Sequence, residues 1–274
     1  MKNVILFSLF LLPILVASQR RPKIKGNRTV TEVTQALPAF NAIELSNDLD
    51  IELKKSLAEG FEVIADDNLV DVLKFEVIDS TLMISSLYDI ISKKKLDIKV
   101  NYRELAAITV KDGKVFTDEI IATDELYLNT FGNAELDIDA SGFMADLNAE
   151  DSSRINLNLD VDSLNVRMKQ KANGLIYAVS GTEKVTLSDN ASLTLEGSSE
   201  IFQVGMSSNS KLRADQLEAA EVYLTIAENG FARVNAFRMF QLASSGSSKT
   251  HLYGSPKITI EAFSDTSQLL KKQD

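Results

Sequence analysis

Residues 190–230 read NASLTLEGSSEIFQVGMSSNSKLRADQLEAAEVYLTIAENG, and this stretch decides the fold. Three polar pairs punctuate it: Asn190-Ala191, Asn209-Ser210 and Asn229-Gly230. Asn and Ser can hydrogen-bond their own backbone and Gly tolerates positive φ, so such pairs are typical of turns. Between the turns, apolar residues alternate with polar ones, as at Val222, Leu224 and Ile226. This alternation predicts strands with one buried and one exposed face.

The same arrangement extends from Leu105 to Glu261. The other turns are Asp112-Gly113, Gly132-Asn133, Ser152-Ser153, Asn173-Gly174 and Gly246-Ser247. Counted between second residues, successive turns lie 20, 20, 21, 17, 19, 20 and 17 residues apart. One rung of this length cannot bury its apolar face alone, whereas stacked rungs share a continuous core. The sequence therefore predicts an all-β, β-helix or β-solenoid-like stack of ~20-residue rungs rather than a β-sandwich, whose turns seldom keep such a spacing.

The repeat also predicts the orientation of individual side chains. Leu224 is expected to face inward and Thr225 outward. Asn173-Gly174 and Asn229-Gly230 are expected to occupy equivalent corners, with each Gly at positive φ. The two 17-residue intervals indicate shorter rungs that bend or tighten the stack.

The chain divides into five segments. Residues 1–18 are typical of a signal peptide, with a short apolar run and cleavage expected between Ser18 and Gln19. Residues 19–27 are read as a flexible leader, and 28–104, which lack the period, as an N-terminal β-rich capping region. That region contains one short helix, expected over residues 68–75 after Asp67 as N-cap. Residues 105–264 form the solenoid repeat and 265–274 a polar C-terminal tail.

Composition limits the function classes. The chain has no cysteine, one histidine and a formal net charge of −10. An acidic surface repels nucleic acid and anionic membranes, so neither is expected as a partner. No transmembrane helix is expected after signal removal. The prediction is an exported protein of the periplasm, cell surface or extracellular space, stabilised without disulfides.

The chain resembles the bacterial family "putative auto-transporter adhesin, head GIN domain". The resemblance starts at Phe40-Asn41-Ala42-Ile43 and continues through Asp66-Asp67-Asn68-Leu69 and Leu82-Met83-Ile84. It includes Ser245-Gly246-Ser247 and closes with Tyr253-Gly254-Ser255-Pro256. The resemblance covers roughly residues 35–265. It implies a right-handed β-helix-like body and an adhesin-like role at the cell envelope.

Catalytic and metal sites are poorly supported by the residues. A Ser-His-Asp triad would have to use His251, whose neighbouring serines match turn chemistry. Asp137 and Asp139 could form a glycosidase carboxylate pair, but 39 acidic residues make such pairs inevitable. Calcium could in principle use same-face aspartate pairs, yet no calcium-loop motif is present. No catalytic residue, metal or cofactor is predicted.

Candidate ligand-binding residues lie on the expected outer face. Arg167, Lys169 and Lys171 would stand together on one strand, as a binding stripe for an anionic glycan or as partners of Glu150, Asp151, Glu183 and Asp189 on adjacent rungs. Tyr127 and Tyr223 lie at outward positions where rings can stack on sugars or on another protein.

Two functions remain open from sequence. The first is an exported, non-enzymatic binding or structural protein, adhesin-like, that presents a repetitive β surface to a glycan or a cell-surface protein. The alternative is a β-helix carbohydrate-active enzyme, a polysaccharide lyase or hydrolase, which needs acidic, basic and aromatic side chains to converge in one groove.

Overall fold

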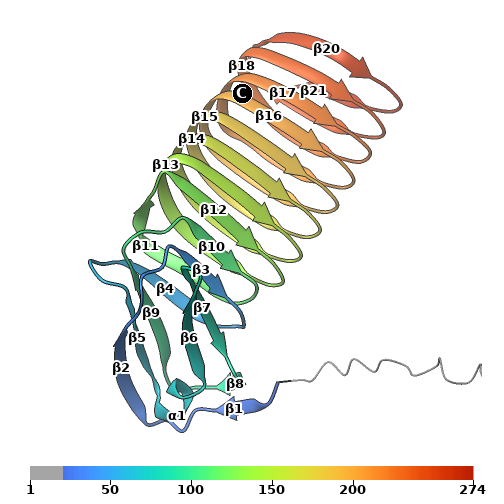
Figure 1. Ribbon diagram of the computed structural model, residues 1–274. Coiled ribbons are helices and arrows are strands. Elements are labelled where there is room, and N and C mark those ends of the chain that lie inside the picture. The colour runs from blue at the N-terminus through green and yellow to red at the C-terminus, as the bar shows by residue number, and fades with distance from the viewer. Residues whose placement is uncertain (1–20, 274) are drawn as a thin grey trace, which may run out of the picture.

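The computed structural model describes residues 21–273 and confirms the predicted solenoid fold. About nine turns of parallel strands stack into an elongated body, and a smaller, largely antiparallel region covers its N-terminal end (Figure 1). The expected signal cleavage between Ser18 and Gln19 lies outside the described residues. No helix in the described part of the chain has the length and apolar character needed to cross a membrane.

Six long strands form the middle of the stack. They are β13 (Glu135–Ala149), β14 (Arg154–Met168), β15 (Asn173–Leu187), β16 (Ser192–Met206), β17 (Lys211–Ile226) and β18 (Phe231–Ser244). Each bends near its middle, at residues such as Phe143 and Gly181 that make no ladder pair. The first half of β13 pairs with β11 (Lys114–Ala122) and its second half with β12 (Glu125–Thr130). Each turn of the solenoid therefore contributes to two sheets.

The first sheet contains the first halves of the long strands. Its other members are β9 (Leu96–Tyr102), β4 (Asp50–Lys55), β11, β19 (Lys249–Tyr253) and β21 (Gln268–Lys271). The second sheet contains the second halves, preceded by β7 (Thr81–Ser86), β3 (Ala42–Leu45), β10 (Ala107–Val110) and β12, and followed by β20 (Lys257–Phe263). Every neighbouring pair in these two series is parallel.

The N-terminal region extends both sheets with antiparallel strands. β2 (Val30–Ala36) pairs with β5 (Gly60–Asp66), which pairs with β9, and β6 (Leu73–Ile78) pairs with β7. β1 (Lys23–Lys25) and β8 (Asp89–Ser92) form a separate two-stranded sheet. Because β3 and β4 already pair in parallel with β10 and β11, stacking begins earlier in the chain than residue 105.

The expected helix is shorter than the sequence indicated. α1 (Asp67–Val70) is a single turn, and its N-cap is Asp66, whose side chain makes no capping hydrogen bond. Residues 73–75 belong to β6 instead. The helical spacing of apolar residues there is overridden because pairing with β7 satisfies the backbone of this segment.

At one corner of successive turns of the solenoid, a residue adopts the left-handed backbone conformation, with positive φ. These residues, all with φ between 57° and 72°, are Gly132, Asp151, Gln170, Asp189, Ser208, Glu228, Gly246 and Asp265. They lie 19, 19, 19, 19, 20, 18 and 19 residues apart. Neighbouring corners are hydrogen-bonded: the Gly132 amide donates to the Asp151 carboxylate at 2.9 Å, and the Gln170 amide donates to Asp189 at 3.1 Å.

The expectation of positive φ at Gly174 and Gly230 was wrong. Gly174 is a buried residue within β15, paired with Ile155 and Leu193. Gly230 follows the left-handed Glu228 by two residues and occupies a buried column of small residues. The other members of that column are Ala134, Ser153, Ala172, Ala191, Ser210 and Ser248.

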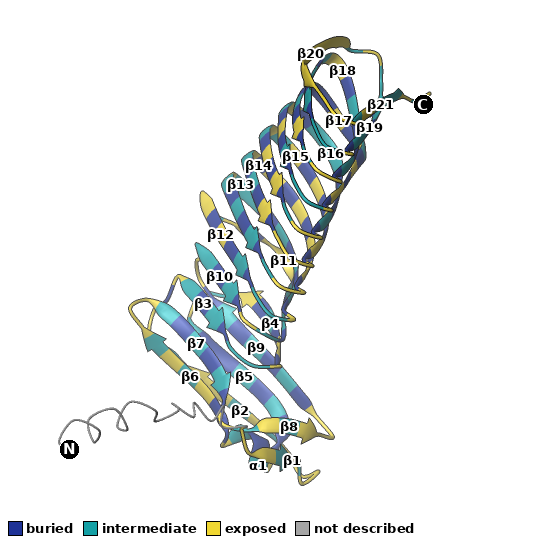
Figure 2. Cartoon of the chain, turned by 90° about the vertical axis from the view of Figure 1, so that its right-hand side faces the viewer, coloured by how far each residue is buried: buried dark blue, intermediate teal, exposed yellow. Residues whose placement is uncertain are grey.

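The core runs without interruption through the stack. Along most of each long strand, β13 to β18, buried residues alternate with partly or fully exposed ones (Figure 2). Leu224 is only 1% exposed and Thr225 is exposed, so the predicted strand register is confirmed. Both outer faces consequently present regular columns of side chains, one residue per turn of the solenoid.

Candidate binding surface

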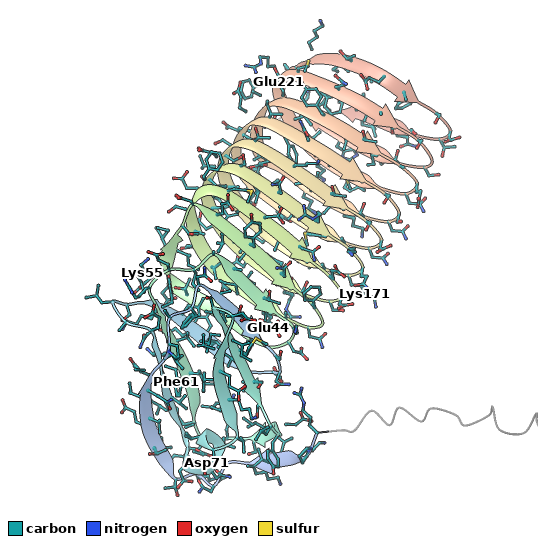
Figure 3. All side chains as sticks on the ribbon, viewed as in Figure 1. Glu44, Lys55, Phe61, Asp71, Lys171 and Glu221 are labelled. Atoms are coloured by element: carbon teal, nitrogen blue, oxygen red, sulfur yellow. The ribbon has the colours of Figure 1, made fainter. Side chains whose placement is uncertain are left out.

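Three of the five predicted binding residues lie on the outer face of the second sheet: Tyr127, Arg167 and Tyr223. Lys169 directly follows the last residue of β14 and is exposed. Lys171 lies instead in the corner turn. Figure 3 labels Lys171 on one side of the solenoid and Glu221, which lies next to a bend, on the other side. Tyr127 and Tyr223 occupy the same column but are separated by five ladder steps. At about 4.8 Å per step this is roughly 24 Å, so the two rings do not form one site.

The cations of this face are largely paired. Arg167 forms an ion pair with Asp146, and Lys169 Nζ lies 2.9 Å from the Glu150 carboxylate. The Lys169 hydrogen bond is the main reason that the pKa of Glu150 is lowered, with a smaller contribution from Asn148. The expectation that Glu150 is a partner is confirmed. The same expectation for Glu183 was wrong, because its side chain is buried in the core. The arrangement matches cross-strand charge pairing.

The tyrosine hydroxyls also have partners. Tyr127 donates to Glu125 at 2.9 Å, and Tyr223 donates to Glu221 at 2.8 Å, which raises the pKa of both phenols. Beside Tyr223 lies a shallow depression of about 340 Å³, whose floor includes Gly205. A side chain at Gly205 would meet nothing within 4 Å, so the missing side chain leaves this depression open.

A larger groove of about 720 Å³ lies on the first sheet near the bend of the last turns. β17, β18, the last residue of β19 and the two residues after it supply its walls. The lining residues are Asp215, Gln216, Glu218, Asn235, Phe237, Tyr253, Gly254 and Ser255.

A break in strand register creates this groove. Ala214 pairs with Val234, whereas the next pair joins Ala219 to Ala236. Residues 215–218 of β17 therefore face Asn235 alone, and β17 bulges there. A second shift follows at the bend, where Phe237 and Arg238 of β18 face Ala220 alone. Gly254 (φ +76°) closes one side, where a Cβ atom would stand 2.2 Å from the Ala236 carbonyl oxygen, so only glycine fits without displacement.

The groove combines one exposed ring with several polar groups. Phe237 is 61% exposed, and Tyr253 lines the same groove. Asp215, Glu218 and Gln216 supply carboxylate and amide groups. An aromatic face beside convergent hydrogen-bonding groups, in a volume within the usual range for ligand sites, suits a sugar ring with its hydroxyls.

None of the groove residues was predicted from sequence. The available signal was the 20-residue interval before Gly230 followed by the 17-residue interval after it. A long turn stacked against a short one requires a bulge, but the intervals alone do not say where along the strand it falls.

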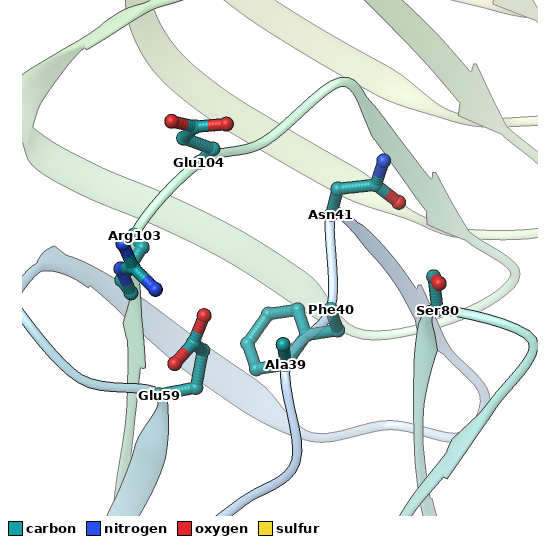
Figure 4. A pocket seen from close by; sticks show the side chains of 7 residues that line it. All are labelled: Ala39, Phe40, Asn41, Glu59, Ser80, Arg103 and Glu104. Carbon is teal, nitrogen blue, oxygen red and sulfur yellow. The ribbon is translucent and has the colours of Figure 1, made fainter.

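A third pocket of about 280 Å³ lies where the N-terminal region meets the first turns. Figure 4 shows the Glu59 and Arg103 side chains close together there, beside the ring of Phe40. Because Phe40 is only 4% exposed, this pocket offers a ligand little aromatic surface.

His251 lacks the partners of a catalytic histidine. Its ring packs edge-on against Phe231, with 5.2 Å between centroids, and among the described residues its buried Nε2 has no hydrogen-bond partner. Burial lowers its pKa, as do the cations of Lys272, Lys249 and Arg233. Within residues 21–273, no group of three or more His, Cys, Asp or Glu side chains is arranged to hold a metal ion.

Comparisons with known proteins agree with the fold. A family model described as "Putative auto-transporter adhesin, head GIN domain" matches residues 39–182 and 145–256, which confirms the resemblance found in the sequence. No curated protein matches the chain.

Solved structures share the architecture at low identity. A "putative adhesin" from Parabacteroides distasonis ATCC 8503 matches with a TM-score of 0.70 and 19% identity, covering 91% of this chain and 100% of that one. A "putative adhesin" from Parabacteroides merdae ATCC 43184 gives 0.69 and 17%, covering 92% and 99%. A "putative lipid binding protein" from P. distasonis ATCC 8503 gives 0.64 and 20%, covering 91% and 99%. At these identities the likeness shows the fold alone.

Proposed function

The chain belongs to the family described as "Putative auto-transporter adhesin, head GIN domain". From this premise we propose that it is an exported, non-enzymatic protein that binds a glycan. The family and its structural neighbours support a binding function at the cell envelope. The groove on the first sheet is the proposed binding site.

One observation carries this proposal: the exposed ring of Phe237 stands in a groove lined by carboxylate, amide and hydroxyl groups. A sugar presents apolar C–H faces that stack on aromatic rings and hydroxyls that hydrogen-bond to carboxylates and amides. The register shifts between β17 and β18 bring both kinds of group into one groove.

The polarity of the groove favours a glycan over a lipid chain. One neighbour of this fold is named a lipid binding protein. An acyl chain would bury little hydrophobic surface against Asp215, Gln216 and Glu218, and it would leave these polar groups without water or partners. The second-sheet residues Tyr127, Arg167, Lys169, Lys171 and Tyr223 remain a proposed accessory contact surface for a glycan or a cell-surface protein.

Substitution of the groove aromatic tests the proposal. Phe237→Ala should abolish binding of the exported chain to the members of a glycan array that the wild type recognises, because the stacking surface is lost. Phe143→Ala is a matched control: Phe143 also lies at a bend and is 59% exposed, but on β13. Unchanged array binding by Phe237→Ala, or equal losses in both variants, would contradict the assignment of the groove.

The same assay addresses the enzyme alternative, which now rests on Asp215 and Glu218 in one groove. Bound oligosaccharides should be recovered intact by mass spectrometry, and shortened or unsaturated products would instead support a hydrolase or lyase.

The proposed export is tested by identifying the first residue of the mature protein. Mass spectrometry of the mature protein should find Gln19 as its first residue, because the apolar segment before it is predicted to be cleaved. A mature form that retains Met1 would contradict export by a cleaved signal.

A further inference from the structure

Basic side chains gather next to the groove in a chain whose formal net charge is −10. The basic patch is defined by five outward residues: Lys211 and Arg213 of β17, Arg233 of β18, and Lys249 and His251 of β19.

Strand pairing brings these side chains into two adjacent columns. Arg213 pairs with Arg233, and Arg233 pairs with His251, so two permanent cations and a histidine occupy successive turns about 4.8 Å apart. In the neighbouring column Phe231 lies between Lys211 and Lys249. The Phe231 ring supports the patch, because the Arg233 guanidinium lies 5.7 Å from its centroid and His251 packs against its edge.

Carboxylates do not balance this patch. Its one ion pair among the described residues joins Arg233 to Asp215 at 3.7 Å, and Lys211, Arg213 and Lys249 have none there. By contrast, Arg154 on the same sheet pairs with Glu135. Arg233 Nε, a permanent donor, is buried with no hydrogen-bond partner in residues 21–273. Like charges on successive strands repel one another unless an anion lies between them.

Asp215 joins the basic patch to the groove. The Asp215 carboxylate forms the ion pair with Arg233 and also lines the groove beside Gln216. Along β17 the order is therefore Arg213, Asp215 and then Glu218, with the cations at one end of the groove and the second carboxylate toward the bend.

We propose that the ligand is an acidic oligosaccharide whose oxyanion, a carboxylate or a sulfate, lies against Arg213 and Arg233 while an adjoining uncharged ring stacks on Phe237. This proposal rests on the proposed function, since it assigns the chemical class of the glycan in that groove. Guanidinium groups form bidentate hydrogen bonds with carboxylate and sulfate oxygens. Glu218 repels an anion from the opposite end, so the charges also fix the direction of the sugar chain.

An array that carries neutral, uronate-bearing and sulfated oligosaccharides tests this inference on the full exported chain. The wild type should bind acidic members most strongly, and binding should weaken as salt rises from 50 to 500 mM, because salt screens partly exposed charges. Arg213→Gln should reduce binding of acidic members about tenfold or more and leave neutral members unchanged. Arg154→Gln, which removes the same charge three strands away on the first sheet, should bind as the wild type does.

The outcomes separate the two proposals. If the wild type shows no preference for acidic members, or if Arg213→Gln binds them unchanged, the acidic ligand is refuted while the groove proposal stands. If Phe237→Ala binds all members as the wild type does, the groove proposal fails. Vesicles containing phosphatidylglycerol should not bind, and binding to them with no array signal would overturn both proposals. Comparison of uronate with sulfate members identifies the oxyanion.

Discussion

Glu183 is a carboxylic acid inside an apolar core. Its side chain is fully buried between Leu164 and Phe202, which pair with it from the two neighbouring strands. Ser180 Oγ donates a hydrogen bond to Glu183 Oε1 at 3.0 Å, and Oε2 has no partner among the described residues. Burial raises the pKa of Glu183 to about 8, against the smaller opposing effect of the Ser180 hydrogen bond.

This raised pKa predicts that the protein loses stability as pH rises. Between its ordinary pKa of 4.5 and the folded value of about 8, the folded chain keeps a proton that the unfolded chain has released. The contribution of Glu183 is therefore unaltered below pH 4.5 and becomes steadily less favourable up to about pH 8. Each pH unit corresponds to about 1.4 kcal/mol. Glu183→Gln should remove this dependence and gain on the order of 3 kcal/mol relative to the wild type between pH 5 and pH 8.

Urea unfolding followed by circular dichroism at both pH values measures that gain. Glu104→Gln, at an exposed position, is the control and should follow the wild type at each pH. A difference between Glu183→Gln and the wild type that stays constant with pH would show that Glu183 does not titrate in this window.

At the scale of the strand, the alternating pattern predicts the energetic cost of substitutions. Leu224→Ala should destabilise the protein by about 2–5 kcal/mol, because it removes a side chain that is 1% exposed and leaves a cavity. Thr225→Ala, at the next and exposed position, should cost less than about 1 kcal/mol. Denaturant unfolding of the two variants checks the pair, and similar losses would mean that the strand is out of register by one residue.

The sequence could predict the strands and their period but not the conformation of each corner residue. Alternation at Leu224 and Thr225 follows from burial alone, so it is visible in the sequence. Positive φ was assigned to Gly174 and Gly230 because glycine tolerates it best, yet Gln170 and Glu228 take that conformation in the equivalent turns. At Gln170 the stack itself stabilises the strained residue, since its side-chain oxygen accepts from the Asp151 amide at 2.5 Å. Such contacts between turns cannot be read from local propensity.

The groove was missed for a similar reason. Phe237, Gln216 and Glu218 belong to no motif, and only the two register shifts between β17 and β18 bring them together. The basic patch likewise requires the pairing of Arg213 with Arg233 and of Arg233 with His251, residues 18 to 20 apart in sequence. The candidate stripe of Arg167, Lys169 and Lys171 was visible because its residues are neighbours in sequence, although only Arg167 belongs to β14.

At the scale of the molecule, the two ends of the stack differ. Antiparallel strands from the N-terminal region cover the first turns, as Figure 1 shows, whereas within residues 21–273 β20 pairs with β18 alone. Every residue of β20 is exposed, including Ile258 (44%), Ile260 (45%) and Phe263 (48%). Lys257 and Glu261 place charges on this strand, and charged side chains on an edge strand disfavour pairing with other chains.

This asymmetry predicts a gradient of stability along the solenoid. Leu164 and Ile258 belong to the same inward column of the second sheet, but Leu164 is 1% exposed and Ile258 is 44% exposed. Leu164→Ala should cost about 2–5 kcal/mol and Ile258→Ala less than half as much, because partial burial leaves less apolar contact to lose. In a stack whose turns contact mainly their neighbours, hydrogen exchange should be fastest in β20 and β21 and slowest in β14 to β16. Equal exchange protection throughout, with equal costs at Leu164 and Ile258, would mean that another molecule covers the last turn in solution.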